Sequence, residues 1–315
     1  MQGPKQSIHF PQLPPLKVLI TGANGMLGRA FVDSVKKHFP QFELRALTQS
    51  SLDITKPEDW EKQAKWIEGG WIIHCAGLVS VEHSETEPAR AEKILVDGTR
   101  FGAELAEKTG AKFFFPQSFL IYDGKTNPIT EETDKSPLSR YGHFKLAAEE
   151  IVRSTLPDSI AACIGGFFGG DDKDKNFVGK IVPILLQKIK AGERSIEVGD
   201  RVWQPTYTSD VANNSLLLMA ARKSGYYLMA SHGEASFHDV ALKVAECLDL
   251  PIEIKKISSS VVSRREIGVR PERAVLLNRR LQAEGMDFQR TWSASLADYL
   301  SRPYFKRLRD ETLSA

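Results

Sequence analysis

Short apolar runs alternate with longer amphipathic stretches over the first half of the chain. Runs of strand length, rich in β-branched and aromatic residues, occur at 16–20, 42–48, 71–76, 112–116 and 159–164. Stretches with helical spacing lie between them, at 29–38, 57–68, 89–108 and 138–154. Strands that alternate with helices are joined by right-handed crossovers, so the pattern predicts an α/β fold built on a doubly wound parallel sheet.

A glycine-rich turn follows the first apolar run. Three glycines with GxxGxxG spacing stand between the first predicted strand and the first predicted helix. Such a turn lets the backbone approach a pyrophosphate and directs helix N-terminal amides at its oxygens. A lone triplet is also typical of a tight surface turn, but here the flanking strand and helix favour a Rossmann dinucleotide site. Its predicted cofactor-binding residues are Gly22, Asn24, Gly25, Met26, Leu27, Gly28 and Arg29.

The pattern becomes less regular after residue 165. Helical spacing continues at 177–190 and 209–222, and extended segments occur at 195–198 and 226–230. We therefore expect a smaller C-terminal lobe that is interleaved with returns to the sheet. The expected divisions are a flexible N-terminal extension (1–15), a Rossmann domain (16–165, with returns near 201–234), a substrate-binding lobe (166–200 and 235–300) and a C-terminal tail (301–315).

Residues capable of binding ligands fall at the ends of predicted strands. The glycine turn follows the first strand, Cys75-Ala76-Gly77 follows the strand at 71–76, and Ser118 follows the strand at 112–116. Ligands of doubly wound sheets bind beyond the carboxyl ends of the strands. We therefore expect Cys75, Ala76 and Gly77 to contact the cofactor and Ser118 to lie beside them.

Tyr141 and Lys145 stand four residues apart in a predicted helix. This spacing places both side chains on one helix face, so an ammonium can approach a phenol. A free tyrosine has a pKa of about 10, and each unit of depression requires about 1.36 kcal/mol, which a lysine and a positively charged nicotinamide can supply together. The pair therefore suggests acid–base catalysis of hydride transfer. The alternative is an exposed helix role for both residues and a turn role for Ser118.

The end of the second predicted strand bears on the choice of cofactor. An acidic residue there would hold the ribose hydroxyls of NAD(H) and repel a 2′-phosphate. This chain has Thr48-Gln49-Ser50-Ser51 instead, and Arg29 follows the last glycine, so NADP(H) is favoured and NAD(H) remains possible. Arg29 is otherwise a solvated helix residue. Asp53 and Ile54 are expected at the adenine, although Asp53 can equally cap the helix near Pro57.

The overall composition excludes several classes of partner. The 315 residues include 42 basic and 40 acidic side chains spread along the chain, for a net charge of +2. Neither nucleic acid nor an anionic membrane surface is an expected partner. The three cysteines have no CxxC spacing, so we expect a cytoplasmic protein with no metal site.

Several stretches together resemble the extended short-chain dehydrogenase/reductase family, and within it the dTDP-4-dehydrorhamnose reductase group. They span most of the chain between 16 and 300. The stretches are TGANGMLGRA (21–30), SLDIT (51–55), SETEPARAEKILVDGT (84–99), YDGKTNPITEETDKSPLSRYGHFKLAAEE (122–150), QPTYTSDVA (204–212) and RPERAVLLNRRL (270–281).

The resemblance implies a nicotinamide-dependent reductase of a 4-keto nucleotide-linked deoxysugar. By position, it makes Ser118 the catalytic hydroxyl, Tyr141 the acid/base and Lys145 the lysine that holds the cofactor ribose. It also places Ser118, Phe119, Asn176 and Arg270 at the substrate, with Arg270 either at a nucleotide diphosphate or in a surface ion pair. A homodimer is expected by analogy.

The sequence departs from the group at three places. Ser118-Phe119-Leu120 replaces a Thr-Asp-Tyr run, Gly165-Gly166 removes an aromatic wall where the group has a tryptophan, and Leu95 replaces an asparagine. Without acidic residues at 119 and 120, a sugar 4,6-dehydratase lacks its extra acid and base. Two alternatives remain open: an epimerase that recycles a bound nicotinamide, and a non-catalytic NADP-binding partner that resembles the regulatory subunit of methionine adenosyltransferase.

Overall fold

A six-stranded parallel sheet forms the centre of the molecule. The structure, a computed structural model, describes residues 8–258 and 267–314. The strand order is β2-β1-β3-β4-β5-β10. Its strands are β1 (Lys17–Thr21), β2 (Glu43–Leu47), β3 (Trp71–His74), β4 (Lys112–Ser118), β5 (Ile160–Ile164) and β10 (Gly225–Met229). The order reverses between β1 and β3, and in such sheets a ligand binds at this reversal. The predicted doubly wound sheet is confirmed.

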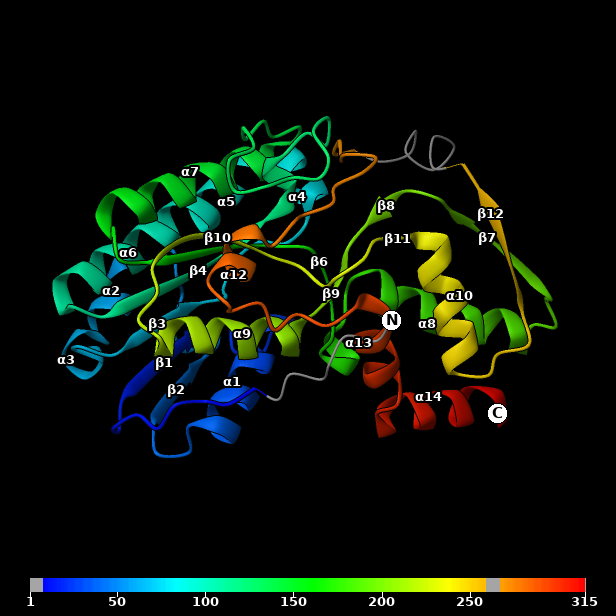
Figure 1. Cartoon of the computed structure of the whole chain (residues 1–315), viewed down its shortest axis with the longest axis horizontal. Helices are drawn as coiled ribbons and strands as arrows, with labels where there is room; N and C mark the ends of the chain where they lie inside the picture. The colour runs from blue at the N-terminus through cyan, green and yellow to red at the C-terminus, as the bar shows by residue number, and fades with distance from the viewer. Residues whose placement is uncertain (1–7, 259–266, 315) are drawn as a thin grey trace.

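Helices cover both faces of the sheet (Figure 1). One face packs against α1 (Met26–His38) and α9 (Thr208–Ala220), and the other against α6 (Gly98–Thr109) and α7 (Arg140–Thr155). Successive residues of a strand supply the two cores in turn. Leu19 of β1 belongs to the α6–α7 core, whereas Val18 and Ile20 belong to the α1–α9 core. This double burial explains why the strands read as continuous apolar runs.

Two stretches predicted as single helices are interrupted. Residues 57–68 form α2 (Pro57–Glu61) and α3 (Ala64–Ile67). Residues 89–108 form α5 (Pro88–Glu92), a π-helical turn η1 (Lys93–Asp97) and α6, and they follow a short helix, α4 (Val81–Thr86). Close packing accompanies the break, because a Cβ on Gly98 would lie 2.9 Å from the Ile54 side chain. Apolar periodicity alone does not reveal this contact.

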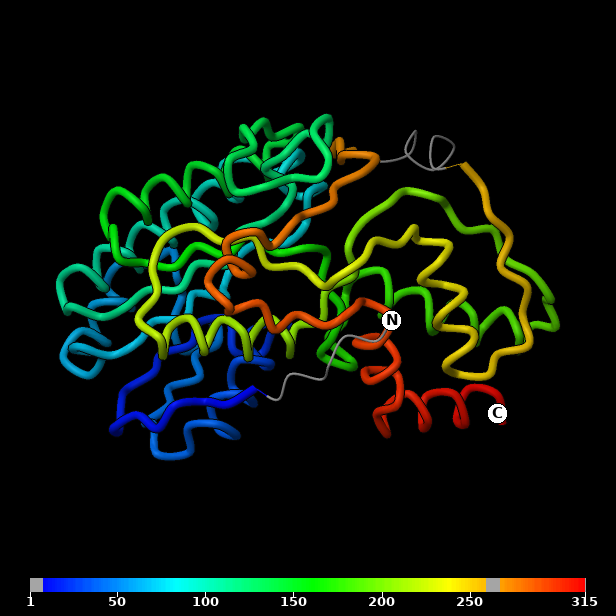
Figure 2. The backbone as a smooth tube through the Cα atoms, viewed as in Figure 1, coloured from blue at the N-terminus to red at the C-terminus, as the bar shows by residue number. Residues whose placement is uncertain are grey.

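The chain passes repeatedly between the sheet and a smaller lobe, as the tube in Figure 2 shows. After β5 it enters the lobe, returns through α9 and β10, and enters the lobe again. The lobe has its own apolar core, in which α8, α10, α13 and α14 take part. The elements outside the main sheet are β6 (Gly166–Phe168), η3 (Asp171–Lys173), α8 (Phe177–Lys190), β7 (Ser195–Gly199), β8 (Val202–Trp203), β9 (Pro205–Tyr207), β11 (Ala235–Ser236), α10 (Phe237–Cys247), β12 (Glu253–Ile257), α12 (Arg279–Ala283), α13 (Trp292–Leu300) and α14 (Pro303–Ser314).

The described parts of both chain ends pack onto the fold. Of the predicted flexible extension, residues 1–7 lie outside the described residues, but Phe10 stacks on His38 with ring centroids 4.0 Å apart. The predicted C-terminal tail contains α14, which packs against α8 and buries Phe305. Among the residues that the structure describes, no helix has both the length and the apolar character that crossing a bilayer requires.

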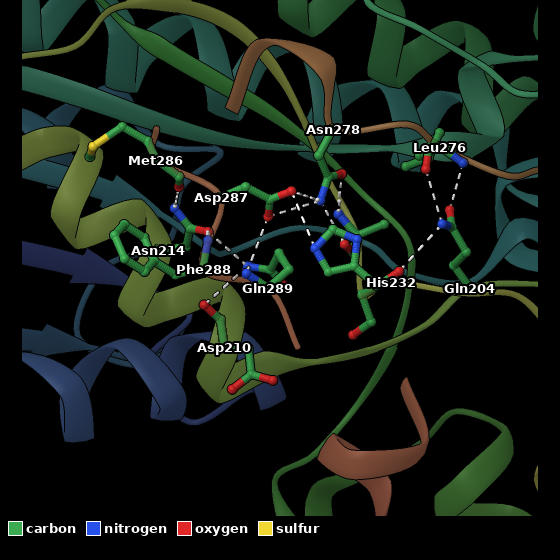
Figure 3. A network of polar contacts seen from close by, with 12 residues as sticks. Gln204, Asp210, Asn214, His232, Leu276, Asn278, Met286, Asp287, Phe288 and Gln289 are labelled. Carbon is green, nitrogen blue, oxygen red and sulfur yellow. Dashed lines mark hydrogen bonds and ion pairs between the residues drawn. The ribbon is translucent and has the colours of Figure 1, made fainter. Parts of the chain in front are cut away.

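A segment from Leu276 to Gln289 runs along the sheet and holds the chain in place where it leaves β10 for the lobe (Figure 3). The buried Asn278 side chain accepts from the Ala230 N–H at 3.0 Å and donates to the Ala230 carbonyl at 2.8 Å. Gln204 pairs with Leu276 in the same way. His232 forms an ion pair with Asp287 at 3.3 Å, and the carboxylate raises the pKa of the imidazole. The side-chain amides of Gln204 and Asn278 thus supply the hydrogen bonds that backbone groups of paired strands would otherwise make.

Candidate active site

The glycine turn between β1 and α1 is tightly packed. Gly22 has φ +63°, and a Cβ on it would lie 2.7 Å from the Ala76 nitrogen. A Cβ on Gly28 would lie 2.2 Å from the Gly22 carbonyl oxygen. Gly25 is exposed and caps the N-terminus of α1, and a Cβ on it would lie 3.2 Å from the same oxygen, a contact that a shift of a few tenths of an ångström relieves. Two glycines are therefore required by the turn itself, whereas Gly25 keeps the exposed side of the helix N-terminus open, as a pyrophosphate requires.

His74 braces the turn from beneath, a role that the sequence analysis did not assign. The Ala76 N–H donates to Thr21 Oγ1 at 3.1 Å, and Thr21 Oγ1 lies 3.0 Å from His74 Nδ1. Thr99 donates its hydroxyl proton to Leu95, so His74 Nε2 must be the donor toward Thr99. Burial, with a contribution from the Lys145 charge, lowers the pKa of His74 to about 3. The imidazole is therefore a neutral support.

Ser118 and Tyr141 meet at the carboxyl end of β4. Ser118 is the last residue of β4, and Tyr141 lies in the first turn of α7, which Ser139 caps by accepting from the Gly142 N–H. Burial raises the pKa of Tyr141 to about 12, although the nearby Ser118 hydroxyl lowers it in part. The two hydroxyl groups thus lie close together at the carboxyl end of β4, where ligands of such sheets bind.

Lys145 lies one helical turn beyond Tyr141 and is buried. Its Nζ donates to the Pro116 carbonyl at 2.7 Å and lies 3.9 Å from the centroid of the Phe115 ring. Burial lowers the pKa of Lys145 to about 7, while Glu149 raises it. The expectation that this lysine favours the phenolate is wrong for the protein by itself. Burial dominates the pKa of Tyr141, and the ammonium is bonded to a backbone carbonyl.

The predicted ribose end carries a compact polar turn. The Thr48 hydroxyl lies 2.9 Å from that of Ser50, and the Ser51 hydroxyl accepts from the Thr48 N–H at 2.9 Å. Arg29 is not simply solvated as the alternative supposed, because it pairs with Asp172 at 3.1 Å. These hydroxyl groups and this guanidinium are the donors that a 2′-phosphate requires.

The structure differs from the sequence reading at the predicted adenine end. Asp53 does not cap the helix at Pro57; its carboxylate accepts from the N–H and the hydroxyl of Thr55. Ile54 is buried against Gly98 and belongs to the α6–α7 core. Its side chain is therefore largely committed to packing. Cys75 follows β3 beside Ala76, and burial raises the pKa of its thiol.

At the predicted substrate end, several residues expected to contact the substrate form contacts within the protein. Phe119 begins a 3-10 turn, η2 (Phe119–Ile121), and packs on the α6–α7 core. Asn176 donates its side-chain amide to the Phe167 carbonyl at 3.0 Å. Arg270 forms an ion pair with Glu82 of α4, while its predicted contact with a nucleotide diphosphate stays a prediction.

An indole from another strand packs on Gly166. A Cβ on Gly166 would lie 2.1 Å from the six-membered ring of Trp203 in β8. The glycine is small because an indole occupies the space above it. Trp203 is buried in the core of the lobe, so the loss of an aromatic wall toward the substrate at Gly165-Gly166 stays a prediction. Gly166 lies two residues beyond Ile164, the register partner of Ser118.

Known proteins are similar to this chain over most of its length. Residues 16–304 match the family described as RmlD substrate binding domain. A dTDP-4-dehydrorhamnose reductase of Streptomyces griseus is 27% identical, with 90% of this chain and 93% of that protein covered. The methionine adenosyltransferase 2 subunit beta of Xenopus tropicalis is 26% identical, with 76% and 74% covered.

Solved structures agree with this match. The crystal structure of a dTDP-4-dehydrorhamnose reductase from Clostridium acetobutylicum superposes with a TM-score of 0.83 at 26% identity, over 90% of this chain and 98% of that one. The same fold is found in dTDP-4-dehydrorhamnose reductase of Bacillus anthracis in complex with NADP, with a TM-score of 0.83 at 22% identity over 91% and 99%. The predicted resemblance is confirmed, and the chain belongs to the RmlD substrate-binding domain family.

Proposed function

We propose that this protein is an NADP(H)-dependent reductase of a 4-keto nucleotide-linked deoxysugar, of the dTDP-4-dehydrorhamnose reductase type. The observation that carries the proposal is the contact between Ser118 and Tyr141 at the carboxyl end of β4, with Lys145 one helical turn away. The names of the Streptomyces griseus and Clostridium acetobutylicum relatives support this substrate class.

The glycine turn fits a dinucleotide. Gly22 and Gly28 allow β1 and α1 to approach closely, and Gly25 keeps the helix N-terminus open toward a pyrophosphate. The turn at Thr48 and the guanidinium of Arg29 would hold a 2′-phosphate, in keeping with the NADP bound by the Bacillus anthracis relative. NAD(H) would use fewer of these donors, so NADP(H) is the proposed cofactor.

The chemistry is the reduction of a carbonyl to an alcohol. The nicotinamide, when bound, supplies the hydride. Tyr141 donates the proton to the carbonyl oxygen, and Ser118 donates a second hydrogen bond that stabilises the developing alkoxide. A tyrosine pKa of about 12 suits this direction of reaction, because the phenol keeps its proton at neutral pH until the alkoxide, a stronger base, forms. Lys145 places a cation beneath these groups.

The proposal is tested by following NADPH absorbance with a panel of 4-keto nucleotide sugars. Wild-type protein is expected to oxidise NADPH with at least one member, and Tyr141→Phe to lose roughly 10²- to 10⁴-fold in rate while it still binds NADPH. His143→Ala, an exposed position on the same helix, is the matched control and should keep full activity.

Two outcomes favour the alternatives. Tight NADPH binding without turnover of any sugar would favour a non-catalytic binding partner, a role suggested by the similarity to the methionine adenosyltransferase subunit and by the apolar Phe119. Interconversion of two sugars without net oxidation of the cofactor would favour an epimerase.

A further inference from the structure

A buried carboxylate lies beneath the proposed catalytic groups. Glu149 stands one helical turn beyond Lys145 in α7 and is 1% exposed. Its Oε2 accepts from Gln117 Nε2 at 2.8 Å, and its Oε1 forms an ion pair with Lys135. Arg153 approaches the same oxygen at 3.6 Å from the exposed side of the helix. The carboxylate is thus paired with cations through Oε1, whereas its Oε2 is bonded to the residue that precedes Ser118.

The Gln117 side chain connects this carboxylate to the active site. Gln117 is 2% exposed and directly precedes Ser118. Its Oε1 accepts from the Ser118 N–H at 2.8 Å, and its Nε2 also donates to the Lys145 carbonyl at 2.9 Å. Both ends of the amide are used, so its orientation is determined. One side chain therefore joins the backbone of Ser118 to α7 between Lys145 and Glu149.

We propose that Gln117 and Glu149 are positioning residues of the active site: Gln117 fixes Ser118 against α7, and Glu149 provides a buried negative charge one helical turn from Lys145. The inference rests on the proposed roles of Ser118 and Lys145. Lys135 supports it from the loop before α7, where its Nζ lies 3.9 Å from the centroid of the Tyr226 ring and contacts the Glu149 carboxylate.

Among the charged groups around it, Glu149 acts most strongly on the pKa of Lys145. The other titratable groups that face the ammonium are Cys75 after β3, Cys163 in β5 and His74 in β3. Burial raises the pKa of both thiols and lowers that of the imidazole, so these three groups are neutral near pH 7. Glu149 opposes the burial that lowers the pKa of Lys145. Its removal should therefore let Lys145 lose its proton at lower pH.

The test is a titration of Lys145 by NMR, with lysine enriched in carbon-13 at Cε and the Lys145 signal identified by its loss in Lys145→Arg. Glu149→Gln keeps an acceptor for Gln117 but removes the charge. The midpoint for Lys145 is expected to fall by about one pH unit, a tenfold change in its acid dissociation constant. Glu150→Gln, at the exposed neighbouring position, should leave it unchanged.

A double variant controls for a loss of stability in Glu149→Gln. Glu149→Gln with Lys135→Met removes both charges of the pair and leaves neither one buried without its partner. The downward shift should persist, and a Lys145 titration that coincides with that of wild type would overturn the proposal. This readout needs no substrate, so it stays informative even if every sugar in the panel is refused. With an active protein, the alkaline limb of kcat should move in the same direction.

Gln117 has a separate test. Gln117→Met has similar volume but loses all three hydrogen bonds. It is expected to lower kcat at least tenfold while the KM for NADPH stays within about twofold, because Ser118 is displaced and the glycine turn is untouched. A wild-type kcat in this variant would contradict the positioning role.

Discussion

Gly28 makes the tightest demand of any residue in the glycine turn. Its α-carbon faces the carbonyl oxygen of Gly22, which itself has φ +63° to reach the backbone at Ala76. A side chain on Gly28 would push α1 away from β1. Gly25 is under no comparable pressure from the protein, so its small size serves the ligand rather than the fold.

We expect Gly28→Ala and Gly25→Ala to separate these two roles. Gly28→Ala should cost about 3 kcal/mol of unfolding free energy, at the upper end of overpacking, because backbone atoms must move. Gly25→Ala should fold with nearly wild-type stability but bind NADPH more weakly. Urea denaturation and NADPH fluorescence measure the two effects. Equal losses of stability in both variants would show that the turn does not distinguish the two glycines.

The sequence predicts which residues lie close together where a motif fixes their spacing, but not the properties that packing decides. The contact between Ser118 and Tyr141 follows from strand-end logic and helical spacing. The raised pKa of Tyr141 does not, because it depends on burial. His74 was missed as a support because its partners, Thr21 and Thr99, are 53 and 25 residues away along the chain.

Among the secondary-structure elements, α1 is in contact with the smaller lobe through the loop between β6 and α8. Gly169, Gly170 and Asp171 all have positive φ, and Gly170 packs against Met26 at the start of α1. Asp172 then pairs with Arg29, each side chain about half exposed. Arg29, the residue proposed to bind the 2′-phosphate, is thus already paired with a carboxylate from the smaller lobe. A bound 2′-phosphate must compete with that carboxylate for the guanidinium.

Asp172→Asn is therefore expected to raise the affinity for NADPH by up to about fivefold, since an exposed ion pair is weak and competes only modestly with a phosphate. NADH lacks the 2′-phosphate, so its affinity should not change. Isothermal titration calorimetry with both cofactors provides the comparison, and Asp158→Asn, an exposed carboxylate elsewhere, is the control. A gain that is equal for NADH would count against contact between Arg29 and the 2′-phosphate.

Elements with strong periodicity were predicted closely and interrupted ones were not. The helix predicted at 177–190 has the bounds of α8. Residues 89–108 were expected to form one helix, yet they contain a π-helical turn followed by Gly98 packed on Ile54. Apolar spacing survives such an interruption, so the sequence does not mark it.

The segment from Leu276 to Gln289 holds the two halves of the molecule in one arrangement. It comes from the C-terminal quarter of the chain but bonds to Gln204, Asn214 and Ala230, which lie before, within and after the α9–β10 segment. Asn278 is the most buried of its polar anchors near Ala230. Its loss would leave a buried N–H and a buried carbonyl unpaired.

Asn278→Ala is expected to lower the free energy of unfolding by about 2–4 kcal/mol, because each unpaired buried group costs about 1–3 kcal/mol. Gln282→Ala, which truncates an exposed amide on α12, should change it by less than about 0.5 kcal/mol. Urea denaturation measures both variants. Equal stabilities would show that this segment does not hold the two halves of the molecule together.

At the scale of the whole molecule, the sequence predicted the sheet and the interleaved lobe but few of the details of the lobe. The strands β6, β8, β9 and β11 have two or three residues each, too few to show a period. Their positions depend on contacts such as Trp203 over Gly166. The C-terminal helix α14 is mostly polar along its length and is held by a few apolar contacts such as Phe305.

The outer strand β10 has a consequence for synthesis on the ribosome. It pairs with β5, although 60 residues that build part of the lobe separate the end of β5 from the start of β10. Until Gly225–Met229 leaves the exit tunnel, a nascent chain presents the apolar β5 edge unprotected, and such edges promote aggregation. Expression of fragments that stop before β10 should therefore yield inclusion bodies, so the cofactor-binding half cannot be produced simply by cutting the gene after β5.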